Sequence, residues 1–400
     1  MRPPDQTSHR DVSGGAGSAS YGAGTLPAGI RSRLVPGING LTVHLLEAGF
    51  ETADRPLVLL LHGFPELAYS WRKIMVPLAQ AGFHVVAADQ RGYGRTTGWD
   101  PSYDASTHPF GFLNVVTDTL ALAAALGREQ VACVVGHDAG SPAAAWCALL
   151  RPDVFRSVVM MSAPFAGPPT LPLSAEGADP LSPAQSDDAL DAELAALARP
   201  RKFYQRWYRT REANDDLLQA PQGLRDVLRA YYHAKSADWA ENDPHPLASR
   251  SAEDLARLPT YYVMDRDRGM AATVAPEMPS ADQVRSCVWL TNAELDVYVT
   301  EYTRTGFQGG LQGYRRYVDP DCVADLCPFA GRTIDVPACF ISGKSDWGVY
   351  QIPGAVEAMR NHACTQMTGF HLVDGAGHWV QQEQPEQVAR LLTAFIRDNA

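Results

Sequence analysis

The stretch Val-Val-Gly-His-Asp-Ala-Gly, residues 134–140, decides how this chain of 400 residues is expected to fold. It comes at the end of an apolar run at 131–135, typical of a strand buried on both faces, and leads into a helix-like segment at 139–150. Glycines two positions before and after the central residue allow a tight turn that projects its side chain over the edge of a sheet. That residue is Asp138, at the positive end of the following helix. We predict that Asp138 is a nucleophile; the alternative is that it only caps the helix.

Short apolar runs alternate with helical patterns on both sides of this turn. The alternation predicts an α/β fold, with a mostly parallel sheet flanked by helices. The expected strands are residues 41–46, 57–61, 84–88, 131–135, 157–161, 336–341 and 370–373. The expected helices of this domain are residues 113–126, residues 139–150 and a C-terminal helix that begins at Pro385.

The pattern changes in the middle of the chain, where helical signals and proline-rich connections replace the alternation. Ser186 is a candidate helix cap, and Thr291 opens a capping box before a helix that is expected to end near Gly306. Because the insertion is far longer than an ordinary loop, we expect it to form a lid or cap. The expected division is a core of residues 31–166 and 333–400 with an inserted helical cap of residues 167–332.

The N-terminal stretch is rich in Gly, Ser and Ala. It offers too little apolar surface to offset the entropy of ordering, so a disordered tail over residues 1–30 is predicted. The seven cysteines are scattered through the chain. Only Cys322 and Cys327 lie close together, without the second pair that a zinc site needs, so no metal site and a reduced, cytoplasmic protein are expected.

Charge and hydropathy exclude two classes of partner. The formal net charge is −11, from 34 Lys and Arg against 45 Asp and Glu, which disfavours binding to nucleic acid. No apolar run approaches the about 18 residues that a membrane span needs. We therefore expect no nucleic-acid or membrane partner, and a homodimer is one possible assembly.

Three further signals follow predicted strands. His-Gly-Phe-Pro-Glu at 62–66 can aim the Phe64 N–H, together with the Ala139 N–H, at a developing oxyanion. Asp346 and His378 each come after a later strand, and the carboxyl ends of parallel strands meet at one edge of a sheet. The chain order is therefore nucleophile, acid, histidine, as in the α/β-hydrolase fold. Taken singly, the acid is also explained as a turn former and the histidine as a loop residue.

These residues resemble the α/β-hydrolase superfamily and, within it, the epoxide hydrolases. The resemblance covers nearly all of residues 36–400 and implies a catalytic triad of Asp138, Asp346 and His378 that needs no metal or organic cofactor. The matching segments are 62–66, Ser70-Trp71-Arg72, 89–94, 136–140, Asp346 and 377–379. The substrate-pocket residues that the resemblance implies are His62, Pro65, His137 and Trp379.

Two cap segments also resemble those of the epoxide hydrolases. Residues 305–315 match the segment with one epoxide-polarising tyrosine, here Tyr314, and residues 203–205 match the segment with the other, here Tyr204. Tyr208, one helical turn further on, is the alternative to Tyr204. Phenols with a pKa near 10 are protonated at neutral pH yet acidic enough to help an alkoxide leave. Packing in the core of the lid is the other explanation for these tyrosines.

The implied activity is hydrolysis of a small apolar organic epoxide by water to a vicinal diol. It would proceed through a glycol ester on Asp138, which a water activated by His378 then hydrolyses. A haloalkane or haloacid dehalogenase with the same nucleophile is the main alternative. However, this chain has Ala139 after Asp138, where epoxide hydrolases and haloalkane dehalogenases commonly have tryptophan and fluoroacetate dehalogenases have arginine. This difference argues against a dehalogenase, and the small side chain predicts a wider floor of the substrate pocket. A ligand-binding receptor on the same fold is another alternative, and an ester or lactone hydrolase fits poorly because an aspartate nucleophile would give an anhydride.

Overall fold

The computed structural model describes residues 21–22, 24–169 and 183–399. Within this part of the chain the main sheet has eight strands in the order β1-β2-β4-β3-β5-β6-β9-β10. The first two strands form an antiparallel hairpin, β2 is antiparallel to β4, and all pairings from β4 onward to β10 are parallel. The carboxyl ends of the parallel strands therefore point to the same edge of the sheet, where ligands bind in folds of this kind.

The strands of this sheet are short and mostly buried. They are β1 (Ile30–Ile38), β2 (Leu41–Ala48), β3 (Leu57–Leu61), β4 (His84–Ala88), β5 (Cys133–His137), β6 (Val158–Met161), β9 (Ala338–Gly343) and β10 (Met367–Val373). The helices of the same domain are α1 (Arg72–Gln80), α2 (Phe112–Ala125), α3 (Gly140–Leu150), α14 (Ala355–Ala358), α15 (Val380–Glu383) and α16 (Pro385–Asn399).

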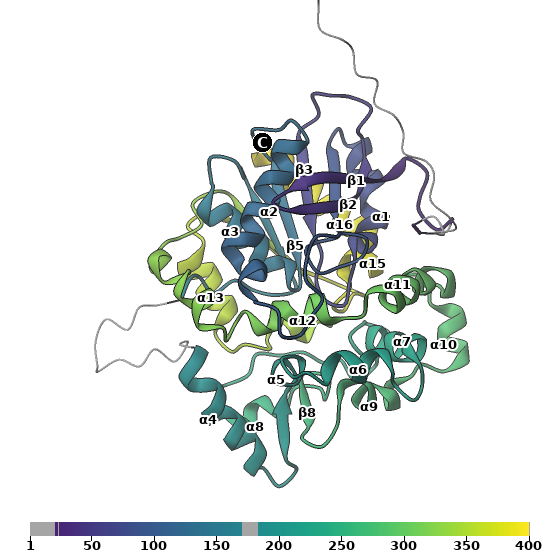
Figure 1. Ribbon diagram of the computed structural model, residues 1–400, viewed down its shortest axis with the longest axis vertical. Helices are drawn as coiled ribbons and strands as arrows, with labels where there is room; N and C mark the ends of the chain where they lie inside the picture. Colours follow the sequence, from purple (N-terminus) through teal and green to yellow (C-terminus); the bar gives the residue numbers. More distant parts are fainter. Residues whose placement is uncertain (1–20, 23, 170–182, 400) are drawn as a thin grey trace, which may run out of the picture.

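Alternate residues of the central strands point into two apolar cores, one on each face of the sheet. In β3, Val58 and Leu60 pack with α1 and α16, whereas Leu57, Leu59 and Leu61 pack with α2 and α3. This arrangement explains why the strand is a continuous apolar run, since both of its faces are covered by helices. Figure 1 shows the helices on both sides of the sheet.

The elements between β6 and β9 form a helical layer that we call the cap, which lies below the sheet in Figure 1. Its helices are α4 (Pro183–Ala196), α5 (Tyr204–Tyr208), α6 (Ala213–Leu218), α7 (Leu224–Ala234), α8 (Ala252–Leu255), α9 (Met270–Val274), α10 (Ala281–Ser286), α11 (Asn292–Thr305), α12 (Gln308–Arg315) and α13 (Pro320–Ala324). A small antiparallel pair, β7 (Arg201–Phe203) and β8 (Val263–Asp265), joins them. The apolar core of the cap is continuous with the core under α1 and α16.

Most elements expected from the sequence are present. The strands expected at 57–61 and 84–88 are confirmed residue for residue, and the capping box at Thr291 begins α11, which ends at Gly306 with a φ of 64°. The expected cap at Ser186 is wrong, because α4 begins earlier, at Pro183. The small β7–β8 pair was not expected, since three-residue strands leave too short a pattern to detect. No helix in the described part of the chain is long and apolar enough to cross a membrane.

The tail predicted over residues 1–30 needs correction at its C-terminal end. Tyr21 is buried, its ring lies 4.3 Å from the ring of His44, and its hydroxyl donates to Asp89 at 3.4 Å. Strand β1 then begins at Ile30. The average composition of the stretch concealed the single large aromatic side chain that anchors it. Residues 1–20 and 23 lie outside the described residues.

Substitution of Tyr21 tests this anchoring. We expect Tyr21→Ala to lower the free energy of unfolding by about 3–5 kcal/mol, as for other buried aromatic residues, and Tyr21→Phe by about 1 kcal/mol. Leu34→Ala, at an exposed position of the neighbouring strand, serves as the control and should change it by less than about 0.5 kcal/mol. Urea denaturation measures all three. Equal values for Tyr21→Ala and Leu34→Ala would contradict the packing of Tyr21.

Candidate active site

The nucleophile candidate stands on a strained turn between β5 and α3. Asp138 has a φ of 51°, in the left-handed region that a residue with a side chain rarely adopts. The two flanking glycines permit it. A Cβ on Gly136 would lie 1.9 Å from the Gly140 carbonyl oxygen, and a Cβ on Gly140 would lie 2.2 Å from the Leu61 carbonyl oxygen. The turn therefore packs backbone against backbone and leaves the Asp138 side chain free to project over the sheet edge.

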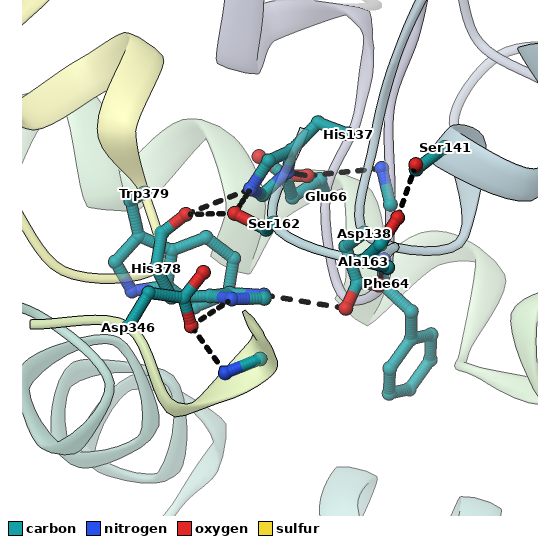
Figure 2. A network of polar contacts seen from close by, with 12 residues as sticks. Phe64, Glu66, His137, Asp138, Ser141, Ser162, Ala163, Asp346, His378 and Trp379 are labelled. Carbon is teal, nitrogen blue, oxygen red and sulfur yellow. Dashed lines mark hydrogen bonds and ion pairs between the residues drawn. The ribbon is translucent and has the colours of Figure 1, made fainter. Parts of the chain in front are cut away.

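The three residues predicted to form a triad do come together. The His378 Nδ1–H donates to Asp346 Oδ1 at 3.0 Å, and His378 Nε2 lies 3.2 Å from Asp138 Oδ2. Figure 2 shows the imidazole between the two carboxylates. Asp346 also accepts from the Gly348 N–H at 2.7 Å and the Ser342 hydroxyl at 2.9 Å, which fixes its orientation. The carboxylate on Nδ1 fixes the orientation of the imidazole ring and directs Nε2 at Asp138.

The two oxygens of Asp138 have different surroundings. The Phe64 N–H donates to Oδ1 at 3.0 Å, whereas Oδ2 faces His378 (Figure 2). Gly63 comes so close that a Cβ there would lie 2.6 Å from Oδ1. Ala139 is the N-cap of α3, immediately after the nucleophile. The loop after β3 thus reaches the carboxylate as its sequence position predicted, and one oxygen is already held by a backbone donor.

Charge in the site keeps both aspartates ionised. Burial alone would raise the pKa of Asp138, but the hydrogen bond and charge of His378, with smaller effects of Lys235 and His137, hold it well below its ordinary value. Burial likewise opposes ionisation of Asp346, yet His378 and the Gly348 N–H lower the pKa of this carboxyl too. An ionised carboxylate in a buried site is a competent nucleophile.

A second acid–histidine pair lies behind the triad, and sequence reasoning assigned it no such role. Glu66 contacts His137 Nδ1 at 2.5 Å, and His137 Nε2–H donates to the His378 carbonyl oxygen at 2.7 Å (Figure 2). Burial alone would lower the pKa of His137, but Glu66 raises it overall. Because both ring nitrogens face acceptors, His137 is best described as an imidazolium that holds the backbone of His378.

The predicted cap tyrosines are buried, and the ring of Tyr314 lies 5.4 Å from that of Phe64, whose N–H donates to Asp138. Tyr204 and Tyr314 pack with ring centroids 6.0 Å apart, and burial followed by the charge of neighbouring groups, Asp138 among them, raises the pKa of each. The Tyr204 hydroxyl donates to Gln351 at 3.2 Å. For Tyr208 the pKa is raised by burial and then by Tyr231, Tyr204 and Asp216. Both Tyr204 and Tyr208 pack against Tyr314, with ring centroids 6.0 Å and 5.0 Å from it, so each is placed to act together with Tyr314.

Comparisons with known proteins agree with this geometry. The chain matches the model of the alpha/beta hydrolase fold family over residues 56–385. Epoxide hydrolase B of Mycobacterium tuberculosis is 34% identical over 366 residues, which cover 89% of this chain and 96% of the relative. A solved epoxide hydrolase from an endophytic Streptomyces has a TM-score of 0.73 at 32% identity, with 93% of this chain and 96% of that chain covered. Potato epoxide hydrolase I has a TM-score of 0.69 at 30% identity, with coverages of 92% and 99%.

The chain belongs to the epoxide hydrolase family. These relatives are enzymes of the α/β-hydrolase type, so the predictions of an enzyme and of this fold, with its inserted cap, are confirmed. In the part of the chain that the structure describes, no group of three or more His, Cys, Asp or Glu side chains is placed to hold a metal ion.

The predicted pocket residues of this family member divide into two groups. His62 lines a cavity that Ala139 also lines, and its Nε2 accepts from the Gln90 N–H at 3.2 Å. His137 and Trp379 are fully buried, with His137 bonded to the His378 carbonyl and Trp379 packed on the His378 ring. The structure therefore corrects their predicted place in the pocket wall: they support the histidine. Pro65 is also buried and contributes its carbonyl oxygen, which accepts from the Tyr232 hydroxyl at 2.8 Å.

The loop that carries His378 is held by hydrogen bonds to the cap and to a buried acid, Glu383. The His378 N–H donates to the Lys235 carbonyl oxygen at 2.8 Å. Glu383 accepts from the N–H groups of Ala237, Gly377 and Trp379, at 2.8 to 2.9 Å. Sequence reasoning missed both residues, because an isolated lysine or glutamate in a helical pattern carries no signal of such contacts.

Glu383 makes stability depend on pH. Burial raises its pKa from the ordinary value of 4.5 to about 8, although its hydrogen bonds partly oppose this. Between these values the folded protein keeps a proton that the unfolded chain has released, so stability falls as pH rises from about 4.5 to about 8. Urea midpoints at pH 6, 7, 8 and 9 should show this decline in the wild type and a flatter profile in Glu383→Gln. Identical profiles would show that Glu383 ionises normally.

Proposed function

We propose that this epoxide hydrolase opens its substrate in two covalent steps, with Asp138 as the nucleophile. One observation carries the proposal. One oxygen of the Asp138 carboxylate is held by a backbone donor and the other faces His378 Nε2, which lies 3.2 Å away. Such a division suits an aspartate that forms an ester through one oxygen and stabilises charge on the other.

The first step is attack of Asp138 Oδ2 on one carbon of the epoxide. The bond between this carbon and the ring oxygen breaks, and the oxygen takes a proton from a phenol as it becomes a hydroxyl. Tyr204 and Tyr314 are suited to this role, because burial raises the pKa of both and keeps them protonated. The product is a hydroxyalkyl ester on Asp138.

The second step is hydrolysis of this ester. His378 Nε2 removes a proton from a water, whose oxygen attacks the ester carbonyl carbon. The negative charge then develops on Asp138 Oδ1, to which the Phe64 N–H already donates at 3.0 Å, with the Ala139 N–H as the second donor in our proposal. Asp346 stabilises the imidazolium. Collapse breaks the bond to the alkoxide, which takes the proton from His378 and leaves as a diol. The carboxyl proton that remains on Asp138 then returns to the phenolate formed in the first step, which restores both groups.

A trapping experiment tests this function. His378→Gln removes the base of the second step and leaves the nucleophile, so the ester should accumulate when styrene oxide is added. Peptide mass spectrometry should then find the full mass of the epoxide on the peptide that contains Asp138. The matched control is the double variant Asp138→Ala with His378→Gln, which should carry no adduct.

The same measurement separates the alternatives. A dehalogenase would instead trap a haloalkane, with a gain of its mass minus hydrogen halide. A receptor without turnover would give no adduct with either compound, and that result would contradict the proposal.

The two cap tyrosines should affect only the first step. We expect Tyr314→Phe and Tyr204→Phe to slow ester formation by about 10²-fold or more, within the range for general acid catalysis, while ester hydrolysis stays close to wild type. Tyr208→Phe is measured beside them, because Tyr208 is the alternative second tyrosine and its ring lies 5.0 Å from that of Tyr314. Single-turnover kinetics resolve the two steps. If Tyr208→Phe is impaired and Tyr204→Phe is not, the assignment of the second tyrosine is reversed.

A further inference from the structure

A cavity of about 70 Å³ is lined by Ala139, the residue that follows Asp138 in the chain, and we call it the side chamber. Its apolar wall comes from the core domain and its far wall from the cap helix α12, which also carries Tyr314. A volume of 70 Å³ is equivalent to about five water molecules in a buried cavity. The lining residues used below are Leu122, Ala139, Ala143, Tyr93, Arg91, Asp118, Asp89, His62 and Arg316.

Small side chains on α3 contribute to this space. Ala139 follows the nucleophile immediately and Ala143 lies one helical turn further on, and both line the side chamber. Leu122 of α2 adds apolar surface beside them. Any larger side chain at residue 139 would extend into the same region, so the alanine at this position is one reason that the chamber exists.

The charged groups around the side chamber leave one positive charge without an acidic partner. Arg91 is paired with Asp118 at 2.7 Å, and Asp89 is paired with His44 at 2.7 Å. His62 is engaged through both ring nitrogens, with the Gly63 carbonyl and the Gln90 N–H. Of the arginines that line the chamber, Arg316 alone has no carboxylate partner among the residues that the structure describes.

Arg316 is buried and only partly satisfied. It is 8% exposed, its Nη1–H donates to the Phe110 carbonyl at 2.9 Å, and its Nε–H has no partner. The guanidinium carbon lies 3.8 Å from the centroid of the Phe112 ring, so one face of the group is covered by an aromatic surface. A buried charge without a counter-ion is costly, and a bound anion would offset that cost.

Tyr93 links this charge to the reaction site. Tyr93 and Arg316 both line the side chamber, and a Cβ on Gly310 would lie 2.7 Å from the ring of Phe64, whose N–H donates to Asp138. A Cβ on Gly310 of α12 would lie 2.9 Å from the Tyr93 hydroxyl. Because Arg316 follows Tyr314 by two residues, the same cap segment carries the epoxide-polarising phenol and the unpaired guanidinium.

We propose that the side chamber is a carboxylate-binding subsite, in which Arg316 holds the anionic end of a short epoxide substrate. The inference rests on the proposed function. The apolar wall accepts a few methylene groups and the guanidinium forms charge-assisted hydrogen bonds to the carboxylate. The size of the chamber limits the substrate to a carboxylate separated from the epoxide by about two to four carbons, because about five heavy atoms fill it.

Matched substrates test the subsite. The wild-type enzyme, Arg316→Met and Arg315→Met are compared on terminal epoxides that carry either a carboxylate or the corresponding primary amide, with one to six carbons between the groups. Arg315 is the control, because it is the adjacent arginine but bonds to Tyr103 and Gln312 outside the chamber. Steady-state kcat/KM is measured for each pair, and thermal melting shows whether each variant is folded.

The wild type should prefer the carboxylate over the amide by about tenfold or more at two to four carbons, through a lower KM. Arg316→Met should abolish this preference and change kcat/KM for the amide less than about twofold, whereas Arg315→Met should keep it. Arg316→Lys, which retains the charge, should restore part of the preference if Arg316→Met proves unstable.

Two failures can be told apart. If the wild type hydrolyses no epoxide, the proposed function itself fails. If it hydrolyses the amides as well as the carboxylates, or if Arg316→Met slows both equally, the epoxide hydrolase function stands and the carboxylate subsite is wrong.

Discussion

The carboxylate of Asp138 projects from a turn with a φ of 51°, and its two flanking glycines leave no room for a Cβ. The turn is held because α3 packs against β3, whose last carbonyl lies 2.2 Å from the place where a Cβ of Gly140 would be. The loop that follows β3 then brings the Phe64 N–H to Oδ1. One close backbone contact therefore fixes Asp138 and the N–H that donates to it together, before any contribution from the cap.

The cap completes the site from the opposite side. Helix α12 crosses the core so closely that a Cβ on Gly309 would lie 2.0 Å from the Gly92 carbonyl oxygen. This contact fixes the position of the segment that carries Tyr314 and Arg316 relative to the core. A second contact joins the layers at the Lys235 carbonyl oxygen, which accepts from the His378 N–H. The arrangement of the proposed site thus depends on contacts between the cap and the core as much as on the contacts among Asp138, Asp346 and His378.

The sequence was sufficient for residues whose role depends on local order along the chain. Asp138, Asp346 and His378 each follow a strand that its apolar pattern reveals, and parallel pairing then brings them to one edge. Residues that act through distant contacts could not be found this way. Glu66 and His137 are 71 residues apart in the sequence, and Glu383 and Ala237 are 146 residues apart. Separations of this length follow no periodic pattern, so the sequence gives no sign of either hydrogen bond. Tyr21 was not predicted to be buried, because the composition of residues 1–30 as a whole indicated disorder and one aromatic residue hardly changes that composition.

The fate of oxygen in a single turnover tests the covalent account most directly. Enzyme in excess over epoxide, in ¹⁸O-water, should give mostly unlabelled diol in the first turnover, because the oxygen added to the substrate comes from the Asp138 carboxylate. The label should appear instead in the peptide that contains Asp138, since water attacks the ester carbonyl. A first-turnover diol that carries the label, with none in that peptide, would show that water attacks the epoxide directly and would contradict the role of Asp138 as nucleophile.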